Sequence, residues 1–478
     1  MLKPRSKALV LKASFGICGE NKGLLELFAI LWPQLRPAIS LKGVQLRIMM
    51  RKWCFLVMCL PLCLVASAQG DAAAWNTAFQ KAKNELKGLA GKPAEAYVAT
   101  GRSLEELAVQ NPGNPEVWYF LGNAIDKFNT SSLENLHASK LALARRASDC
   151  FVNSIDLSDS NTYTGDKILF DPHTKILSVW GAQAERYLSA GDKDSAIWCL
   201  QQAEAYGGVN ASVSAYFKQV LDECTDSAYL FTNGDVYFYY ISYLQLVENY
   251  KPHVHCISLN FLNTQWYPEY LRKKGSLHFA FGKEELAKIR SKKWKQESFT
   301  VQNKAGIGGD TAIVWKATPK DDSYMLRSDI ILKDFLQENG FKSDVYFAAD
   351  VPENMRLYLG VDNYAALQGL TLKIVPNWRA TSLSYLENRL AMLNELSPED
   401  DGDFTFNKDN IQVLNNYRFA YTAAADLAMS QNQLKAAENI LLFEEKKYPE
   451  TLLPFYADAT RKWFDGFKEK ILMAAANN

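Results

Sequence analysis

Two polar loops carry the residue types that could do chemistry: "TNGD" at residues 232–235 and "NFLNTQWY" at residues 260–267. Amide and carboxylate groups beside an aromatic ring suit a sugar or a peptide, because hydroxyl groups need paired donors and acceptors while C–H faces stack on rings. The candidate binding residues are Asn233, Asp235, Asn260, Asn263, Thr264 and Trp266. The alternative is turn and cap chemistry, in which Asn, Gly and Asp serve the loops themselves.

Other clusters that could hold a metal or a phosphate are incomplete. His253 and His255 point to one face of an expected strand and Cys256 follows, but no third metal ligand stands at a useful spacing. The glycine-rich "NKAGIGGDT" at 303–311 lacks the Lys-Ser/Thr of a phosphate loop, so a mobile turn is expected there. The acidic "PEDDGD" at 398–403 is expected to be a solvated linker with weak calcium potential. No GxSxG, HExxH or Cys/His arrangement is found, so we predict no cofactor and no catalytic residue.

The strands and helices that must position the two loops follow from the pattern of residues 225–398. Short β-rich runs occur at residues 228–231, 253–259, 311–317, 344–349 and 370–375. Amphipathic stretches separate them, notably one that ends at Gly340. Strands that alternate with helices predict a mainly parallel, three-layer α/β domain. Ligands of such sheets bind beyond the carboxyl ends of the strands, so the two loops meet if the first two strands are parallel neighbours.

Helical pairs are expected on both sides of this domain, over residues 69–224 and 399–478. Small and large apolar residues recur there at the spacing of tetratricopeptide-like repeats, in which small residues let paired helices approach closely. These residues are Trp118, Leu121, Gly122, Ile125, Ala147, Phe151, Trp180, Ala184, Tyr187, Ala196, Leu200, Ala203, Tyr421, Ala425, Ala428, Ala437 and Leu441. Cys150 and Cys199 take equivalent places in two copies, where small core residues are favoured over a bridge between repeats.

Residues 49–68 have the three parts of a signal peptide. Arg51 and Lys52 precede an apolar run at 54–65, and small residues at 66–68 predict cleavage before Gln69. Residues 1–48 are then expected to be an upstream extension without a structural role. No later segment approaches 18 consecutive apolar residues, and the nearest, residues 236–247, is short and interrupted. The mature chain is therefore expected to be exported and periplasmic, with no transmembrane segment.

The charge distribution bears on the kind of partner. Of 53 Lys and Arg residues, ten lie within residues 1–68, against two of 53 Asp and Glu residues, which leaves a net charge of −8 on the rest. An acidic body without a basic stripe argues against nucleic-acid binding. With 48% apolar and 22% charged residues, the chain has the composition of a folded protein rather than a disordered one.

Several blocks of sequence resemble a known family. They are "YLFTNGD", "YLQLVE", "KPHVHCISLNFLNTQWY", "DVYFAADV", "GLTLKIVP" and "YRFAYTAAADLAMSQNQLKAAENILLFEEKKYPE". Together they resemble the soluble C-terminal region of protein O-mannosyltransferase-like bacterial membrane proteins, a domain-of-unknown-function family among the C-type glycosyltransferases. The resemblance runs from about Asp226 to Pro454. The family's transmembrane catalytic helices have no counterpart here, and Val236 and Tyr237 replace a second Asn-Asp of its first motif.

These patterns favour an exported, non-catalytic binding or scaffold protein. The helical pairs would recognise a protein partner in the cell envelope, and the α/β domain a glycan or peptide. The resemblance implies a role accessory to a membrane glycosyltransferase. The alternative is an enzyme or enzyme subunit of protein O-glycosylation, with Asp235 as its acid.

Overall fold

The computed structural model describes residues 72–476 apart from residues 321–322, 362, 378–380 and 397–406. The chain divides into Met1–Thr77 and Ala78–Asn478, and the following description concerns the second part. The expected extension 1–48, the expected signal peptide 49–68 and the acidic segment 398–403 lie outside the described residues. Among the helices that are described, none is both long enough and apolar enough to cross a bilayer.

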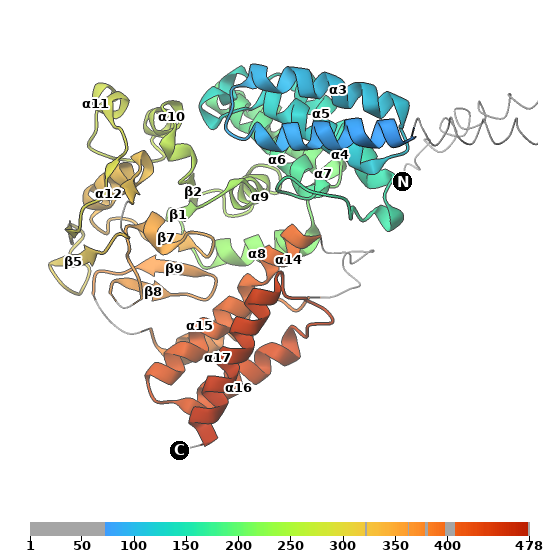
Figure 1. Ribbon diagram of the computed structural model, residues 1–478. Coiled ribbons are helices and arrows are strands. Elements are labelled where there is room, and N and C mark those ends of the chain that lie inside the picture. Colours follow the sequence, from blue (N-terminus) through green and yellow to red (C-terminus); the bar gives the residue numbers. More distant parts are fainter. Residues whose placement is uncertain (1–71, 321–322, 362, 378–380, 397–406, 477–478) are drawn as a thin grey trace, which may run out of the picture. The chain divides into compact units, whose positions relative to one another are not determined.

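Helices form the part of the chain that precedes the sheet (Figure 1). After a helix that ends at residue 88 come α3 (Tyr97–Gln110), α4 (Pro115–Asn129), α5 (Leu141–Asp156), α6 (Pro172–Ser189), α7 (Lys193–Ala205) and α8 (Ala211–Asp222). Consecutive helices from α3 to α7 pack against each other. The helices expected over this region are therefore present, and neighbours in the chain are in contact.

Polar residues mark where these helices begin. The side chains of Asn114, Asp171, Asp192 and Asn210 accept hydrogen bonds from backbone N–H groups in the first turns of α4, α6, α7 and α8, respectively. These N–H groups have no partner within the helix, so a capping oxygen stabilises the start by about 1 kcal/mol. In α4 and α6 a proline follows the cap directly, where its fixed φ suits the first helical position.

Two glycines set the closest helix contacts. A Cβ atom on Gly122 of α4 would lie 2.9 Å from the ring of Phe151 on α5, and one on Gly181 of α6 would lie 2.3 Å from the ring of Tyr239. Each ring therefore occupies space that only glycine leaves open.

A five-stranded sheet follows, in the order β2 (His255–Ser258), β1 (Tyr229–Thr232), β7 (Val345–Ala348), β9 (Thr371–Ile374) and β8 (Ala365–Leu367). Strand β1 runs parallel to β2, with Tyr229 opposite His255, and parallel to β7, with Tyr229 opposite Val345. The first two strands are therefore parallel neighbours, as the convergence of the two loops would require.

The sheet is mixed rather than mainly parallel. Strand β9 is antiparallel to both β7 and β8. Its pairing with β8 is antiparallel because only residues 368–370 join the two strands, and so short a loop reverses the chain. The run expected at 311–317 is outside this sheet: β5 (Ala312–Ala317) forms an antiparallel hairpin with β4 (Glu297–Gln302). The glycine-rich segment 303–311 is the loop of that hairpin. A further short pair joins β3 (Lys292–Lys293) and β6 (Tyr324–Met325).

Helices α9 (Asp235–Leu246) and α12 (Arg327–Asn339) flank the parallel strands. On α12, Phe335 packs against Tyr229 and Phe231, with ring centroids 4.7 and 5.4 Å apart. Helix α9 contacts β2 and also α6, α7 and α8. It is the short apolar run expected at 236–247, and its burial against protein accounts for its hydropathy. Two further helices, α10 (Trp266–Lys274) and α11 (Lys283–Lys288), lie between β2 and β3.

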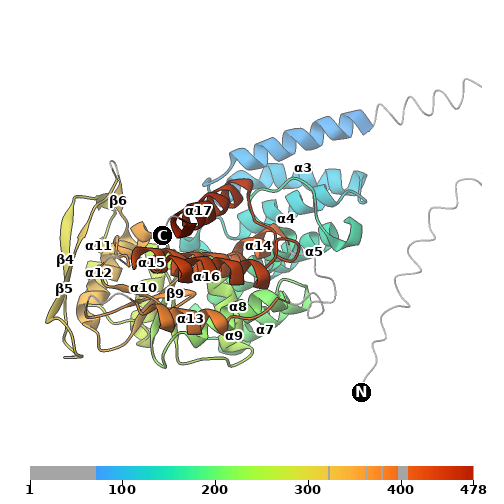
Figure 2. The same cartoon turned by 90° about the horizontal axis from the view of Figure 1, so that it is seen from below.

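The C-terminal region comprises α13 (Leu383–Ala391), α14 (Lys408–Leu414), α15 (Asn416–Ser430), α16 (Leu434–Lys447) and α17 (Asp458–Ala476). Helices α15, α16 and α17 pack side by side (Figures 1 and 2). The buried Arg418 of α15 pairs with the buried Glu444 of α16 and donates to the carbonyls of Tyr448 and Leu453 at 2.6 Å. Burial raises the Glu444 pKa to about 7, against the opposing effect of Arg418.

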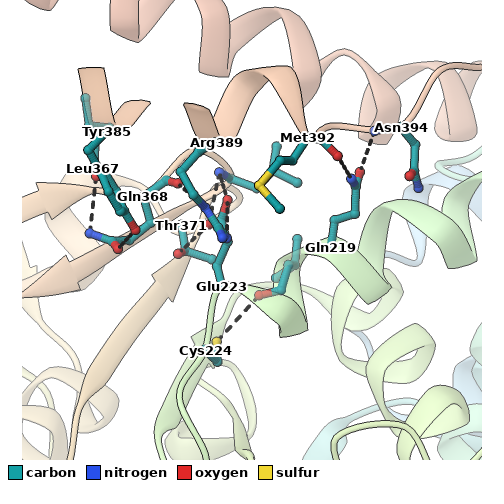
Figure 3. A network of polar contacts seen from close by, with 12 residues as sticks. Gln219, Glu223, Cys224, Leu367, Gln368, Thr371, Tyr385, Arg389, Met392 and Asn394 are labelled. Atoms are coloured by element: carbon teal, nitrogen blue, oxygen red, sulfur yellow. Dashed lines mark hydrogen bonds and ion pairs between the residues drawn. The ribbon is translucent and has the colours of Figure 1, made fainter. Parts of the chain in front are cut away.

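A polar network joins α8 to the sheet and to α13 (Figure 3). The buried Glu223 carboxylate accepts hydrogen bonds from the Leu370 N–H at 2.9 Å and from Thr371 Oγ1 at 2.7 Å. Arg389 of α13 lies 3.7 Å from the same carboxylate. Nearby, Gln219 of α8 donates to the carbonyl of Met392. The network therefore attaches the end of α8 to the start of β9 and to α13.

Candidate functional site

A cavity of about 370 Å³ lies beyond the carboxyl ends of β1 and β7, between the sheet and helices α14 and α15. Its lining residues come from five separate parts of the chain. They are Phe170, Asn233, Gly234, Val236, Tyr237, Ala349, Asp350, Asp409, Gln412, Val413, Asn416, Phe419 and Tyr456. The cavity has the size of a small-ligand site.

The strand order explains its position. From β1 the chain leads through α9 to β2 on one side, whereas β7 pairs with β1 on the other side. The connections that leave β1 and β7 therefore separate, and a crevice opens between them at the strand ends. Gly234, with a φ of +83°, makes the turn from β1 into α9. A left-handed backbone of this kind favours glycine.

Asp350, two residues after the end of β7, lines the crevice. Its Oδ2 accepts a hydrogen bond from the Asn233 N–H at 2.8 Å. Its other oxygen, Oδ1, is buried and has no hydrogen-bond partner within the described part of the chain. Burial raises the pKa of the Asp350 carboxyl well above its usual range. The unpaired oxygen could therefore accept a hydrogen bond from a ligand when ionised, or carry a proton that it donates.

The opposite wall carries Asp409 of α14 and Asn416 of α15. Asp409 Oδ2 accepts a hydrogen bond from the Asp171 N–H at 2.7 Å, and burial raises its pKa. Asn416 Nδ2 donates to the hydroxyl of Tyr237 on α9. Burial, and then the nearby Asp350, raises the pKa of Tyr237, so this hydroxyl keeps its proton.

The chemistry of the lining narrows the class of ligand. It includes two carboxyl groups, three side-chain amides and four aromatic rings, and it includes no Lys, Arg or His. Phosphates and other anions are held by basic side chains or free N–H groups, so this lining disfavours them. Amides and carboxyls beside rings suit a neutral ligand with several hydroxyl groups.

Of the six predicted binding residues, Asn233 lines the cavity. Asp235 is the first residue of α9, next to the lining residues Gly234 and Val236, and its side chain lies outside what the structure describes. Four predicted residues do not line the cavity: Asn260, Asn263, Thr264 and Trp266.

These four residues sit where the chain turns from β2 into α10, through the short helix η6 (Phe261–Asn263). Asn263 Oδ1 accepts from the Ser328 N–H at the start of α12, and Thr264 Oγ1 accepts from the Tyr267 N–H at the start of α10. The carbonyl of Asn260 accepts from the Asn263 N–H. Asn263 and Thr264 therefore act as turn and cap residues, which is the alternative to ligand binding given for this loop.

Trp266 attaches this loop to the helical region. Its Nε1 donates to the carbonyl of Leu133 at 2.9 Å, and the N–H of Gln265 donates to Glu134 Oε2 at 2.7 Å. Both acceptors belong to the short helix η4 (Leu133–Ala138), in the linker between α4 and α5. The expected convergence of Trp266 with the Asn233 loop is not found, because the indole is engaged in packing between elements.

The cavity also contains residues that sequence reasoning did not select. Asp350 follows a predicted strand directly, so the rule that selected Asn233 would have selected it too. Asp409, Gln412 and Asn416 lie on helices more than 170 residues after Asn233 in the chain, and no local pattern connects them with the sheet. Their contribution follows only from how α14 and α15 pack.

The metal and disulfide expectations concern other parts of the fold. No group of three or more His, Cys, Asp or Glu side chains suited to a metal occurs among the described residues. His255 stacks on Tyr229, with ring centroids 5.0 Å apart. Cys150 and Cys199 are free and buried, as expected for small core residues, and burial raises both pKa values to about 12.

The comparisons with known proteins match one segment. A family described as TMEM260-associated domain 2 matches residues 213–277, from α8 through β1, α9 and β2 to α10. No curated protein and no solved structure shows significant similarity to the chain. The matched segment supplies Asn233, Gly234 and Tyr237 to the cavity, whereas Asp350 and the helical wall lie outside it.

Proposed function

We propose that this protein is an exported, periplasmic binding protein whose cavity at the ends of β1 and β7 takes a neutral carbohydrate, such as the terminal sugars of a glycan. The observation that carries the proposal is the lining, which combines hydrogen-bonding carboxyls and amides with aromatic rings and includes no Lys, Arg or His. The buried, unpaired Oδ1 of Asp350 supplies an acceptor for a sugar hydroxyl.

Two further observations support a connection with protein glycosylation. The matched segment belongs to a domain associated with TMEM260, itself a protein O-mannosyltransferase-like protein. The blocks between Asp226 and Pro454 resemble the soluble region of proteins of the same type. We therefore place the protein beside a membrane glycosyltransferase, as an accessory that holds a glycan or a glycosylated acceptor.

The helical pairs would supply the surface for a protein partner. We propose that they are tetratricopeptide-like repeats that bracket a three-layer α/β core, with the close contact of Gly122 and Phe151 as the kind of approach that such repeats need. Affinity purification from the envelope fraction tests this part: an enriched membrane glycosyltransferase supports it. N-terminal sequencing of the exported chain tests the cleavage before Gln69.

A matched pair of variants tests the carbohydrate site. Asn233→Ala removes an amide that lines the cavity, whereas Asn260→Ala removes an amide at the end of the neighbouring strand that does not. On a glycan array we expect Asn233→Ala to lose affinity by roughly three- to tenfold, as for one lost hydrogen bond between neutral groups, and Asp350→Asn by roughly tenfold or more, as for one to a carboxylate. Asn260→Ala should bind like the wild type. Equal binding by all four proteins would reject the site.

A second candidate function is glycosyl transfer, in which Asp350 and Asp409 would act as acid and base. It is favoured by the raised pKa of both carboxyls on opposite walls of one cavity. Asp235, the acid suggested by sequence, begins α9 at the same cavity. Transfer of sugar by the purified protein, abolished by Asp350→Asn, would establish this function in place of simple binding.

A further inference from the structure

A second and larger cavity, of about 580 Å³, lies between the α6–α7 turn, α9, β2 and α10. It shares no lining residue with the cavity at the ends of β1 and β7. Its lining combines one buried acid, three aromatic rings, His255, two exposed lysines and a set of aliphatic side chains. This combination of opposite charges around an apolar space is the basis of the inference.

The buried acid is Glu185 on α6. Only 3% of this residue is exposed, and the described residues provide its carboxylate with neither a hydrogen bond nor an ion pair. Burial raises its pKa to about 8, and Lys274 opposes that rise only in part. A buried carboxylate without a direct ion pair or hydrogen bond is energetically unfavourable. Because this one faces a cavity, a cationic group of a ligand would supply the missing partner.

Aromatic rings of Phe238, Tyr267 and Tyr270 line the same cavity. The centroid of the Tyr267 ring lies 6.3 Å from that of Phe238 and 6.2 Å from that of Tyr270. Burial, followed by the charge of Glu185 for both, raises the pKa of Tyr267 and Tyr270. Ring faces next to a carboxylate are the usual surroundings of a bound ammonium group.

The exposed lysines indicate that the ligand also carries a negative charge. Lys193 at the start of α7 and Lys274 at the end of α10 are solvent-exposed lining residues, so they lie at the mouth of the cavity. Lys274 Nζ lies 5.6 Å from the centroid of the Tyr270 ring. A ligand with only positive charge would be repelled at the mouth, and one with only negative charge would offer no cation to Glu185. A ligand that carries both charges satisfies both ends.

We propose that this cavity binds a zwitterion with an apolar side chain, either a free apolar amino acid or a short apolar peptide with free ends. The ammonium group lies against Glu185 and the rings, the carboxylate faces Lys193 and Lys274, and the side chain occupies the aliphatic part of the cavity. The cavity volume lies within the range of small-molecule sites.

Calorimetric titration of the full chain with L-leucine and with L-leucyl-L-leucine tests the proposal. We expect at least one of them to bind, and the preferred one identifies the ligand as amino acid or peptide. Blocking either end, as in N-acetyl-L-leucine or L-leucinamide for the amino acid and the corresponding blocked dipeptides, should weaken binding by roughly tenfold or more.

Variants locate the site. Glu185→Gln keeps the shape of the side chain and should weaken binding by roughly 30-fold or more, since it removes a buried charge partner. The double variant Lys193→Gln/Lys274→Gln changes only exposed residues, so its folding is secure, and it should weaken binding by about three- to tenfold, most at low salt. Matched controls are Glu95→Gln and Lys316→Gln, which alter exposed residues outside the cavity.

The outcomes separate this proposal from the carbohydrate site. Asp350→Asn should leave leucine or dileucine binding unchanged, and Glu185→Gln should leave glycan binding unchanged. Absence of binding by both unblocked probes, equal binding of blocked and unblocked probes, or unaltered affinity in both the Glu185 variant and the lysine variant would overturn the proposal.

Discussion

The backbone N–H of Asn233, at the end of β1, donates a hydrogen bond of 2.8 Å to Oδ2 of Asp350, at the end of β7. The two residues are 117 positions apart in the chain, yet this bond holds together the two strand ends at which the sheet opens. It uses one oxygen of the carboxylate and leaves the other buried and unpaired. The same side chain therefore fixes the crevice and offers an acceptor inside it.

Two substitutions of Asp350 should act in opposite directions on stability. Asp350→Ala leaves the Asn233 N–H without an acceptor and should lower the free energy of unfolding by about 1–3 kcal/mol. Asp350→Asn keeps an acceptor and removes a charge whose folded-state pKa is raised, so above the unfolded pKa it should be at least as stable as wild type. Urea unfolding at pH 8 checks both; a less stable Asn variant would contradict the account.

Trp266→Phe should affect stability and not carbohydrate binding. The change removes the hydrogen bond from Nε1 to the carbonyl of Leu133 and keeps most of the ring packing. We expect a loss of about 0.5–1.5 kcal/mol in the free energy of unfolding. Thermal unfolding and the glycan array measure the two effects; reduced glycan binding with unchanged stability would restore the binding role predicted from sequence.

Gly181→Ala should be strongly destabilising, because the new Cβ would lie 2.3 Å from the Tyr239 ring. Overpacking of this kind costs about 1–3 kcal/mol. The matched control is Gly113→Ala, where no atom lies within 4 Å of the new Cβ. The denaturant midpoint of Gly181→Ala should be lower than that of Gly113→Ala. Equal midpoints would show that α9 does not lie tightly against α6.

Removing one partner of the buried pair Arg418–Glu444 should lower the free energy of unfolding strongly, whereas replacing both by apolar residues should lower it little. Arg418→Met leaves a buried carboxylate without its partner and should cost about 3–5 kcal/mol. Adding Glu444→Leu should recover most of that loss, because no unpaired charge remains. A double-mutant cycle from urea unfolding measures the coupling; strictly additive losses would contradict a direct pair.

Glu185 should make stability depend on pH. Its folded pKa, about 8, lies above the usual glutamate value, so the folded state retains the proton longer than the unfolded state. This contribution to stability is fully present below about pH 4 and is lost as pH rises through about 8, with a slope of at most about 1.4 kcal/mol per pH unit. Urea unfolding from pH 5 to 8 should therefore show a flatter curve for Glu185→Gln. A curve identical to that of wild type would contradict the burial of this charge.

The local elements were predictable because their causes are local. The apolar runs at 228–231 and 253–259 became parallel neighbours, and the amphipathic stretch ending at Gly340 became α12, where Gly340 adopts a left-handed φ of +48°. The error at 311–317 has a physical cause as well: alternating apolar residues predict a strand but do not say which strand it pairs with.

The candidate site was less predictable because it is assembled from distant parts. Asn233 follows from the rule on strand ends, but Asp409 and Asn416 reach the cavity only through the packing of α14 and α15. The loop around Asn263 satisfies the same rule and instead caps α10 and α12. The same residue types serve ligands and backbone turns, so composition alone does not separate the two.

Helix α9 joins β1 to β2 and at the same time packs against α6, α7 and α8. A cut of the chain near Cys224, between the first helical region and the sheet, would therefore remove α9 from the helices that it packs against. It would also separate Tyr239 from Gly181, against which its ring lies. The two regions should consequently melt in one cooperative transition, and fragments made separately should regain order only when mixed, as complementing halves of a single folding unit.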